Sequence, residues 1–205
     1  MLRSMTESNE LKVAGLLLAA GGSTRLGRPK QLVEFQGKTL IRRAAQALID
    51  AGCSPVVAVL GAEVELSQRE VEELGVEVVV NAAWASGMGS SIAFGMGPIN
   101  SVDPQPDAVL ISVCDQPFVT AEKLSPFIET FDRSRVDVVA ARYKDIAGVP
   151  ALFSKTLFPR LLDLKGDNGA REIIRNSPDA MTIPLPDAGI DVDTVDDVAH
   201  ITSHI

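Results

Sequence analysis

Cysteine is scarce in this chain. Its 205 residues include only two, Cys53 and Cys114, which lie far apart in or beside apolar runs. They form no CxxC pair, and no histidines accompany them at the spacing of a metal site. The scarcity argues against a disulfide framework or a zinc-binding fold, and we expect both thiols to be reduced and buried.

Positive charge is also in short supply. Nineteen Lys and Arg stand against 27 Asp and Glu, which gives a formal net charge of -8. Proteins that bind nucleic acid concentrate Lys and Arg so that they can displace counterions from phosphates. The excess of acidic residues therefore argues against a nucleic-acid partner. Any phosphate site must be confined to a small part of the surface.

Long apolar segments are missing as well. No apolar stretch approaches the roughly 18 to 20 residues of a membrane span. The first ten residues are polar and lack the apolar core of a signal peptide. We expect a cytoplasmic protein without a membrane partner, in which a disordered tail over residues 1–10 precedes a single domain over residues 11–205.

Shorter apolar runs are present, and they alternate with segments of helical spacing. A run that is apolar on both faces is typical of a buried parallel strand. The fold class predicted is α/β, with a doubly wound and mostly parallel sheet. The predicted strands are 13–18, 56–60, 76–80, 108–113 and 136–141, and the predicted helices are 40–49, 64–74 and 120–131. The region 142–193 is predicted to be an insertion with short helices at 154–164 and 168–176.

The strongest functional signal is the loop after the first strand, which reads LAAGGSTRLGRPK over residues 18–30. Ligands of open α/β sheets bind beyond the carboxyl ends of the strands, and glycines let backbone N–H groups approach an anion. No G-x-G-x-x-G frame is present. A Walker A frame at Gly22 and Gly27 is followed by Arg28-Pro29, so it lacks both the lysine and the hydroxyl of that motif.

This loop resembles the signature L-A-A-G-x-S-x-R-[LM]-G-x-x-K of the MobA-like NTP transferases, which it fits throughout. The resemblance continues in order through SGMGSS at 86–91, CDQP at 114–117, GDNGAR at 166–171 and DVDT at 191–194. It is strongest to the molybdenum cofactor cytidylyltransferases. It implies a Rossmann-like fold of the nucleotide-diphospho-sugar transferase type and transfer of a nucleoside monophosphate from a magnesium-bound NTP to a phosphorylated acceptor.

The resemblance also assigns roles to individual residues. Arg25, Lys30 and Asp115 are the catalytic set, and Asp115 with Asp193 holds Mg²⁺. Asp115 directly follows a predicted strand, and Asp191 and Asp193 would share one face if they lie on a strand. A capping role for Asp193 or Thr194 at a following helix remains open beside metal binding. The expected nucleotide and acceptor contacts are Leu18, Ala19, Ala20, Gly21, Gly22, Arg25, Lys30, Asn81, Gly89, Ser90, Ser91, Asp115, Gly148, Pro150, Asp167 and Arg171.

Substrates follow from the same resemblance. Ala20 favours CTP, because GTP-using relatives typically read LAGG, and Asn81 is expected to read the base. Arg171 is expected to pair with the phosphate of the acceptor, for which molybdopterin is the leading hypothesis, with a molybdoenzyme or its chaperone as a candidate protein partner. A sugar or polyol phosphate acceptor is an alternative, and so is a non-catalytic carrier of nucleotide or molybdenum cofactor. Trp84 and Phe94 are expected to pack, and base stacking by Trp84 remains open because it is close in sequence to the turn at Ser86.

Overall fold

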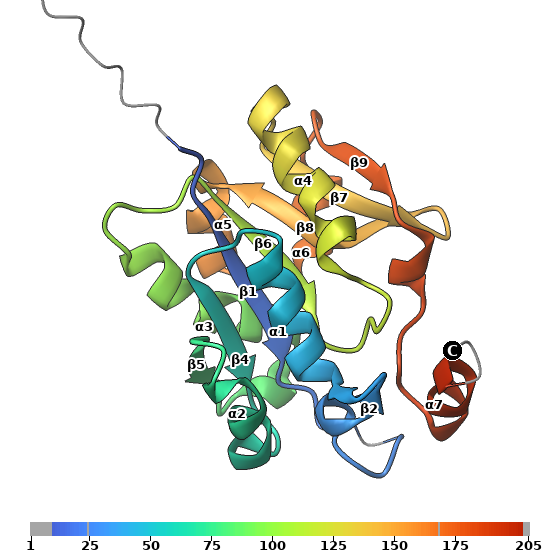
Figure 1. Ribbon diagram of the computed structural model, residues 1–205. Helices are drawn as coiled ribbons and strands as arrows, with labels where there is room; N and C mark the ends of the chain where they lie inside the picture. Colours follow the sequence, from blue (N-terminus) through green and yellow to red (C-terminus); the bar gives the residue numbers. More distant parts are fainter. Residues whose placement is uncertain (1–9, 24, 168, 203–205) are drawn as a thin grey trace, which may run out of the picture.

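The computed structural model describes residues 10–23, 25–167 and 169–202 (Figure 1). The prediction of a disordered tail over residues 1–10 therefore falls, except for Glu10, outside the described residues. A seven-stranded sheet runs through the molecule in the order β5-β4-β1-β6-β8-β7-β9. Its strands are β1 (Val13–Ala19), β4 (Val56–Leu60), β5 (Glu77–Val80), β6 (Ala108–Val113), β7 (Val138–Tyr143), β8 (Ile146–Ser154) and β9 (Met181–Pro184).

The sheet is mostly parallel, as predicted. β1 pairs in parallel with β4 and β6, β4 with β5, and β7 with β9, while β8 runs antiparallel to both β6 and β7. The central strands β1, β4 and β6 are buried along their whole length. Strands covered on both faces need apolar side chains on both, which explains why these segments read as continuous apolar runs.

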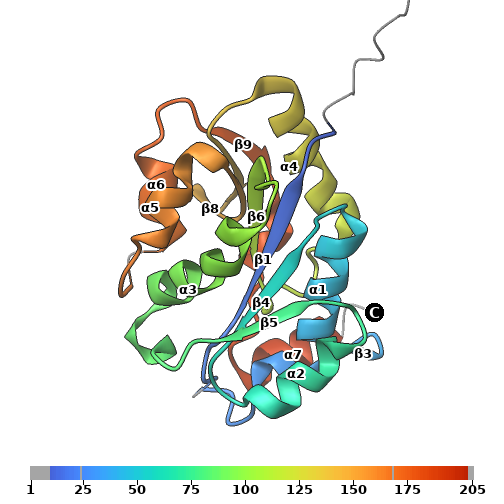
Figure 2. The same ribbon diagram turned by 90° about the vertical axis from the view of Figure 1, so that its left-hand side faces the viewer.

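Helices cover both faces of the sheet (Figure 2). One apolar core lies under α1 (Leu40–Asp50), α2 (Val64–Glu72) and α4 (Ala121–Ser134). The other lies under α3 (Met88–Ser101), α5 (Phe158–Leu162) and α6 (Ala170–Arg175). Side chains of a strand alternate between the two layers, so Leu17 joins the first core and Leu16 the second.

A third, smaller cluster lies beneath the first loop. It includes Leu26 of that loop, Val192 near the end of the chain and Ile201 of the C-terminal helix. The elements around it are the hairpin β2 (Glu34–Phe35) and β3 (Lys38–Thr39) and the helix α7 (Val195–Thr202). The cluster therefore joins the first loop to the C-terminal segment, which are far apart in sequence.

The region 142–193 corrects the prediction of an insertion. It contributes β8 and β9 to the main sheet, and its first predicted helix is a 3₁₀ turn at Lys155–Leu157 followed by α5. The second predicted helix begins at residue 168, outside the described residues, and the described helix is α6. Further 3₁₀ turns lie at Lys30–Leu32, Trp84–Ser86 and Pro186–Gly189. Among the described residues, no helix combines the length and the apolar character needed to cross a membrane.

Candidate active site

A buried glutamine holds the loop after β1 in place through hydrogen bonds. Gln31 is 0% exposed, and its amide donates hydrogen bonds to the carbonyl oxygens of Ala19 at 2.8 Å and Gly21 at 2.7 Å. The hydroxyl of Ser23 accepts from the backbone N–H of Lys30 at 2.8 Å, which closes the loop on itself. Sequence reasoning missed Gln31, because a polar residue inside a short turn contributes to no periodic pattern. The signal available was its position immediately after Lys30, at the end of the motif.

A pocket of about 300 Å³ opens at this loop, at the carboxyl end of the central strands. Its walls combine the loop, the turn before α3 and the end of β6. The sequence motifs at 18–30, 86–91 and 114–117 thus meet at one place. The lining residues are Leu18, Ala19, Ala20, Gly21, Lys30, Trp84, Ala85, Gly87, Met88, Ser91, Val113, Cys114 and Asp115.

Charged side chains gather at the pocket. The ammonium group of Lys30 lies 2.5 Å from Oδ2 of Asp115 and 3.0 Å from Oδ1 of Asp193, and Arg25 pairs with Oδ2 of Asp193 at 2.7 Å. Burial acts to lower the pKa of Lys30, but the charge of Asp115 and the hydrogen bonds from both carboxylates outweigh it. The pKa of Lys30 is therefore raised, and the amine stays protonated at neutral pH.

Residues 191–193 do not form a strand, so the condition under which Asp191 and Asp193 would share one face is not met. The N–H of Val192 donates to the backbone oxygen of Asp115 at 2.9 Å and sets the two segments side by side. Thr194 caps α7 by accepting from the N–H of Asp197 at 3.2 Å, while the carboxylate of Asp197 accepts from the N–H of Thr194 at 2.7 Å. Thr194 is therefore the residue that caps α7, and the carboxylate of Asp193 contacts Lys30.

The carboxylates fit a hard divalent cation. Asp115 and Asp193 both reach a single nitrogen atom of Lys30, so both can reach one metal ion at the same place. In residues 10–23, 25–167 and 169–202 no group of three or more His, Cys, Asp or Glu side chains is arranged to hold a metal. Two carboxylates are nevertheless the typical protein share of a Mg²⁺ site that substrate phosphates complete. Burial, together with the charges of Asp115 and Asp193, raises the pKa of the nearby Asp191.

The turn before α3 is built from polar side chains that bond to one another. Asn81 is 1% exposed, and its amide donates to the hydroxyls of Ser90 at 3.0 Å and Ser91 at 3.1 Å. Its side-chain oxygen accepts from the N–H of Ala83 at 2.9 Å. Both N–H groups of the amide are therefore used inside the protein. These bonds make Asn81 a positioning residue of the turn, and its contact with the base stays a prediction.

This turn also packs against the GDNGAR segment. The N–H of Gly89 donates to the carbonyl of Gly166 at 2.8 Å. Gly87 has φ +124°, and a Cβ there would lie 2.3 Å from the carbonyl carbon of Gly166 and 2.4 Å from Oδ1 of Asp167. Glycine is required at 87 both by the backbone conformation and by this close approach. Two motifs separated by about 80 residues are thus joined backbone to backbone.

Trp84 packs as predicted. Its ring lies so close to Gly22 and Gly61 that a Cβ at either position would come within 2.5 Å of a ring carbon. Gly22 therefore faces Trp84 and is not among the residues that line the pocket. Phe94 is 52% exposed on α3, so the prediction that it packs is wrong.

Both cysteines are free and buried, as predicted. Burial raises the pKa of the Cys53 thiol to about 12. Burial also raises the pKa of Cys114, and the charge of Asp115 adds to that shift. Neither thiol is an activated nucleophile, because the nucleophilic form is the thiolate.

A second pocket of about 340 Å³, here called the acceptor pocket, adjoins the first. Met88 lines both, and the other lining residues include Val149, Asp167 and Arg171. The structure therefore brings Asp167 and Arg171 together, as expected. Gly148 and Pro150 flank Val149 on β8 but do not line this pocket; a Cβ at Gly148 would lie 2.8 Å from the hydroxyl of Tyr143.

Comparison with known proteins places this geometry in a family. Residues 15–181 match the model of the MobA-like NTP transferase domain. The nicotine blue oxidoreductase of Paenarthrobacter nicotinovorans is 32% identical over 194 residues, 90% of this chain and 93% of that protein. A probable molybdenum cofactor guanylyltransferase of Bacillus cytotoxicus is 28% identical over 156 residues, 74% of each chain.

A solved structure shares both fold and sequence with the chain. Rv0371c of Mycobacterium tuberculosis in complex with manganese has a TM-score of 0.77 and 25% identity, over 95% of this chain and all of that one. The matched model covers the first loop, the strand-end carboxylate Asp115 and the acceptor pocket. The chain belongs to the MobA-like NTP transferase family and is a nucleotidyltransferase.

Proposed function

We propose that the protein transfers CMP from magnesium-bound CTP to the phosphate of molybdopterin and releases pyrophosphate. The observation that carries the proposal is the ion-pair network in which Lys30 lies between Asp115 and Asp193 at the mouth of the loop pocket. It supplies cationic groups for a triphosphate and paired carboxylates for its metal within one site. Both are needed where charge builds on a phosphate and on a departing pyrophosphate.

Arg25 and Lys30 are the residues that would hold the triphosphate. The side chain of Arg25 is 70% exposed and that of Lys30 is 17% exposed, so Arg25 meets solvent while Lys30 lies deeper. Both are now paired with carboxylates. We expect a bound metal to take over the carboxylates and release both cations to the phosphates.

The metal bound by Asp115 and Asp193 would polarise the α-phosphate and neutralise charge on the triphosphate. An oxygen of the acceptor phosphate attacks the α-phosphorus, the bond from that phosphorus to the bridging oxygen breaks, and pyrophosphate leaves with the electron pair. The acceptor phosphate is already an anion at neutral pH. No side chain has to act as nucleophile or general base, which agrees with the protonated thiol of Cys114, the cysteine that lines the pocket.

The choice of CTP rests on Ala20. This residue lines the loop pocket and is 7% exposed. Its methyl group narrows a pocket of about 300 Å³ relative to a glycine at the same place, which favours the smaller pyrimidine ring. The guanylyltransferase names of relatives point to GTP for those proteins, so base preference is a direct test.

The experiment measures pyrophosphate release from CTP, GTP, ATP and UTP with Mg²⁺ and molybdopterin. Asp115→Asn keeps the shape of the side chain and removes its charge, and we expect a loss of about 100-fold in turnover, near 3 kcal/mol of transition-state stabilisation. Asp132→Asn is the matched control, because Asp132 is exposed on α4 and pairs only with Arg135 among the described ion pairs. Its turnover should equal that of the wild type.

The outcomes separate the candidate functions. Release with CTP alone, lost in Asp115→Asn, would support the proposal. Release with GTP alone would overturn the role given to Ala20. Release only with a sugar or polyol phosphate as acceptor would replace molybdopterin, and nucleotide binding without release or metal dependence would support a carrier.

A further inference from the structure

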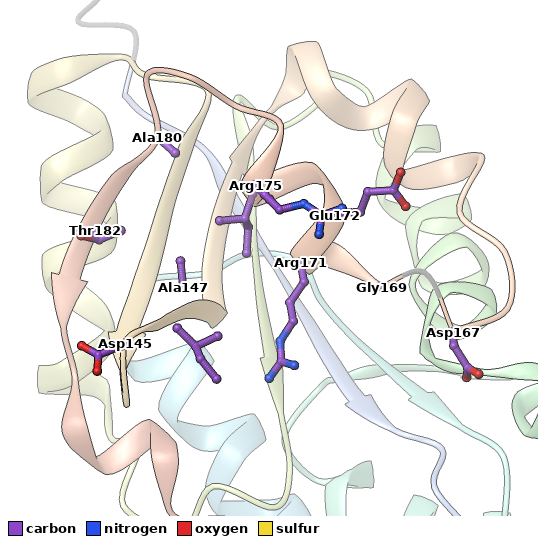
Figure 3. Close-up of a pocket in the computed structure, with 11 residues that line it drawn as sticks. Asp145, Ala147, Asp167, Gly169, Arg171, Glu172, Arg175, Ala180 and Thr182 are labelled. Carbon is purple, nitrogen blue, oxygen red and sulfur yellow. The ribbon is translucent and has the colours of Figure 1, made fainter.

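A third pocket continues from the acceptor pocket, on the side away from the nucleotide. It has a volume of about 540 Å³ and lies between α6, the beginning of β8 and β9 (Figure 3). It shares Asp167, Gly169 and Arg171 with the acceptor pocket. We call it the distal groove. The three pockets form one continuous series, because Met88 joins the first to the second.

Part of the wall of the distal groove is apolar. Ile146 and Ala147 of β8, Ile174 of α6 and Ala180 before β9 supply it. Ile146 is 40% exposed although it is a large aliphatic residue. Apolar walls with a few convergent polar groups are typical of sites for small organic ligands.

The groove contains positively and negatively charged side chains, and the ion pairs of the described residues include none of them. Arg171 and Arg175 are four residues apart on α6 and so lie on one side of the helix. Among the ion pairs of the described chain, neither takes part in one. Figure 3 shows Arg171 extending from α6 alongside β8, with Asp145 and Thr182 across the groove on the hairpin turn and on β9.

Asp145 is held in a fixed place by its turn. It follows Lys144 in the two-residue connection between β7 and β8, where φ is +48° at Lys144 and +60° at Asp145. The backbone conformation of a two-residue turn of this kind matches the twist of the two strands that it joins. Its carboxylate can only accept hydrogen bonds at neutral pH, whereas the guanidinium groups opposite can only donate them.

The charge of the lining argues against a polyanionic ligand. Two arginines line the groove together with the three acids Asp145, Asp167 and Glu172, so the lining has no net positive charge. A site for a second phosphate would be expected to have one. The arrangement suits an uncharged ligand with N–H donors on one edge, for a carboxylate, and a carbonyl oxygen on another, for an arginine.

We propose that the distal groove binds a flat amino-oxo heterocycle of the pterin type, with its amino and ring N–H groups on Asp145 and its carbonyl oxygen on Arg175, while Arg171, which lines both pockets, stays available to the phosphate. This inference rests on the proposed function and deepens it, since the pterin ring of the acceptor is the group that would lie there. Its phosphate would then point through the acceptor pocket toward the nucleotide. An amino-oxo purine such as guanine has the same donors and acceptor on a smaller ring system. The experiment therefore includes both rings.

The test measures binding without catalysis. Neopterin carries the pterin ring but no phosphate, and its fluorescence anisotropy reports binding to the full-length protein with no NTP present. The variants are Asp145→Asn, which keeps a residue that tolerates positive φ, and Arg175→Met. Arg160→Met is the matched control, because Arg160 is exposed on α5 and lines a different hollow.

We expect neopterin to bind, with affinity about tenfold weaker or worse in each groove variant and unchanged in the control, since each variant removes a hydrogen-bonding partner of the ligand. Guanosine should displace it poorly. Binding of guanosine without binding of neopterin, binding of neither ring, or equal binding by wild type and both variants would overturn the proposal.

The result is separable from that of the proposed function. Neopterin binding with no pyrophosphate release from any NTP would leave the groove in place and refute transfer to molybdopterin. Pyrophosphate release with molybdopterin in the absence of neopterin binding would refute the role of the groove and support transfer to molybdopterin. In active enzyme, Asp145→Asn should raise KM for the acceptor and leave KM for CTP unchanged.

Discussion

Gln31 offers the sharpest test of how the nucleotide loop is held. The change Gln31→Met preserves the length of the side chain and removes the two donors that bond Ala19 and Gly21. The oxygen of Ala19 is in a buried contact, and leaving it without a partner costs about 1–3 kcal/mol. Gly21 is exposed, so water can replace its bond at little cost. We expect a total loss of about 2 kcal/mol.

This loss should appear in two measurements. Urea denaturation should give a lower midpoint with an unchanged slope, because the surface exposed on unfolding is the same. KM for CTP should rise about tenfold, since binding must then also order the loop. Turnover at saturating CTP should change less, because Lys30, Asp115 and Asp193 are all retained.

Gln46→Met is the matched control. Gln46 bonds only to Asp50, on the exposed surface of α1, so stability and KM should both stay within experimental error of the wild type. Wild-type stability together with wild-type KM in Gln31→Met would refute the role of Gln31. A loss of stability with unchanged KM would show that the loop is shaped by other contacts.

Three further predictions address other parts of the site. Gly87→Ala should lower the free energy of unfolding by about 2 kcal/mol or more, because of the positive φ at this position and the clash with the facing turn. Gly97→Ala, inside the helix α3 that follows, meets nothing within 4 Å and should unfold at the wild-type temperature or above. Thr194→Val removes the cap of α7 and should cost about 1 kcal/mol in thermal unfolding and reduce turnover through Asp193. The pKa of Cys53 is raised in the folded protein, so the contribution of this thiol to stability should be constant below pH 9 and be lost between about pH 9 and 12. Urea midpoints over that range should therefore fall less steeply in Cys53→Ala than in the wild type.

The nucleotide half of the fold could be predicted from the sequence because its signals are local. The three central strands are buried on both faces, so each reads as an apolar run, and the loop after β1 carries its motif without interruption. Asp115 follows β6 directly, which is enough to place it at the carboxyl edge of the sheet.

The acceptor half could not be predicted in the same way. β8 contains Gly148 and Pro150, which weaken a strand pattern, and β9 is mostly exposed, so it has no apolar run to detect. Both strands are defined by pairing with β6 and β7, which is a tertiary effect. The grooves beside them therefore had no sequence signal beyond the individual residues at their rims.

Asp193 shows how a side chain can be positioned without regular secondary structure. Its segment forms no strand and is held by a backbone hydrogen bond from Val192 to Asp115 and by the cap at Thr194. The two carboxylates are therefore set by contacts between segments about 80 residues apart. Such contacts cannot be read from either segment alone.

The turn at the start of α3 connects the motifs of the two halves of the molecule. Asn81, Ser90 and Ser91 hold the turn, and Gly87 and Gly89 attach it to the segment that carries Asp167 and Arg171. Met88, between the two glycines, is a wall of both the nucleotide pocket and the acceptor pocket. If nucleotide and acceptor occupy these two pockets as proposed, a shift of this turn would move both substrates at once. In-line attack depends on the distance between acceptor phosphate and α-phosphorus, so we expect these residues to act on the reaction by fixing that distance without touching the reacting atoms.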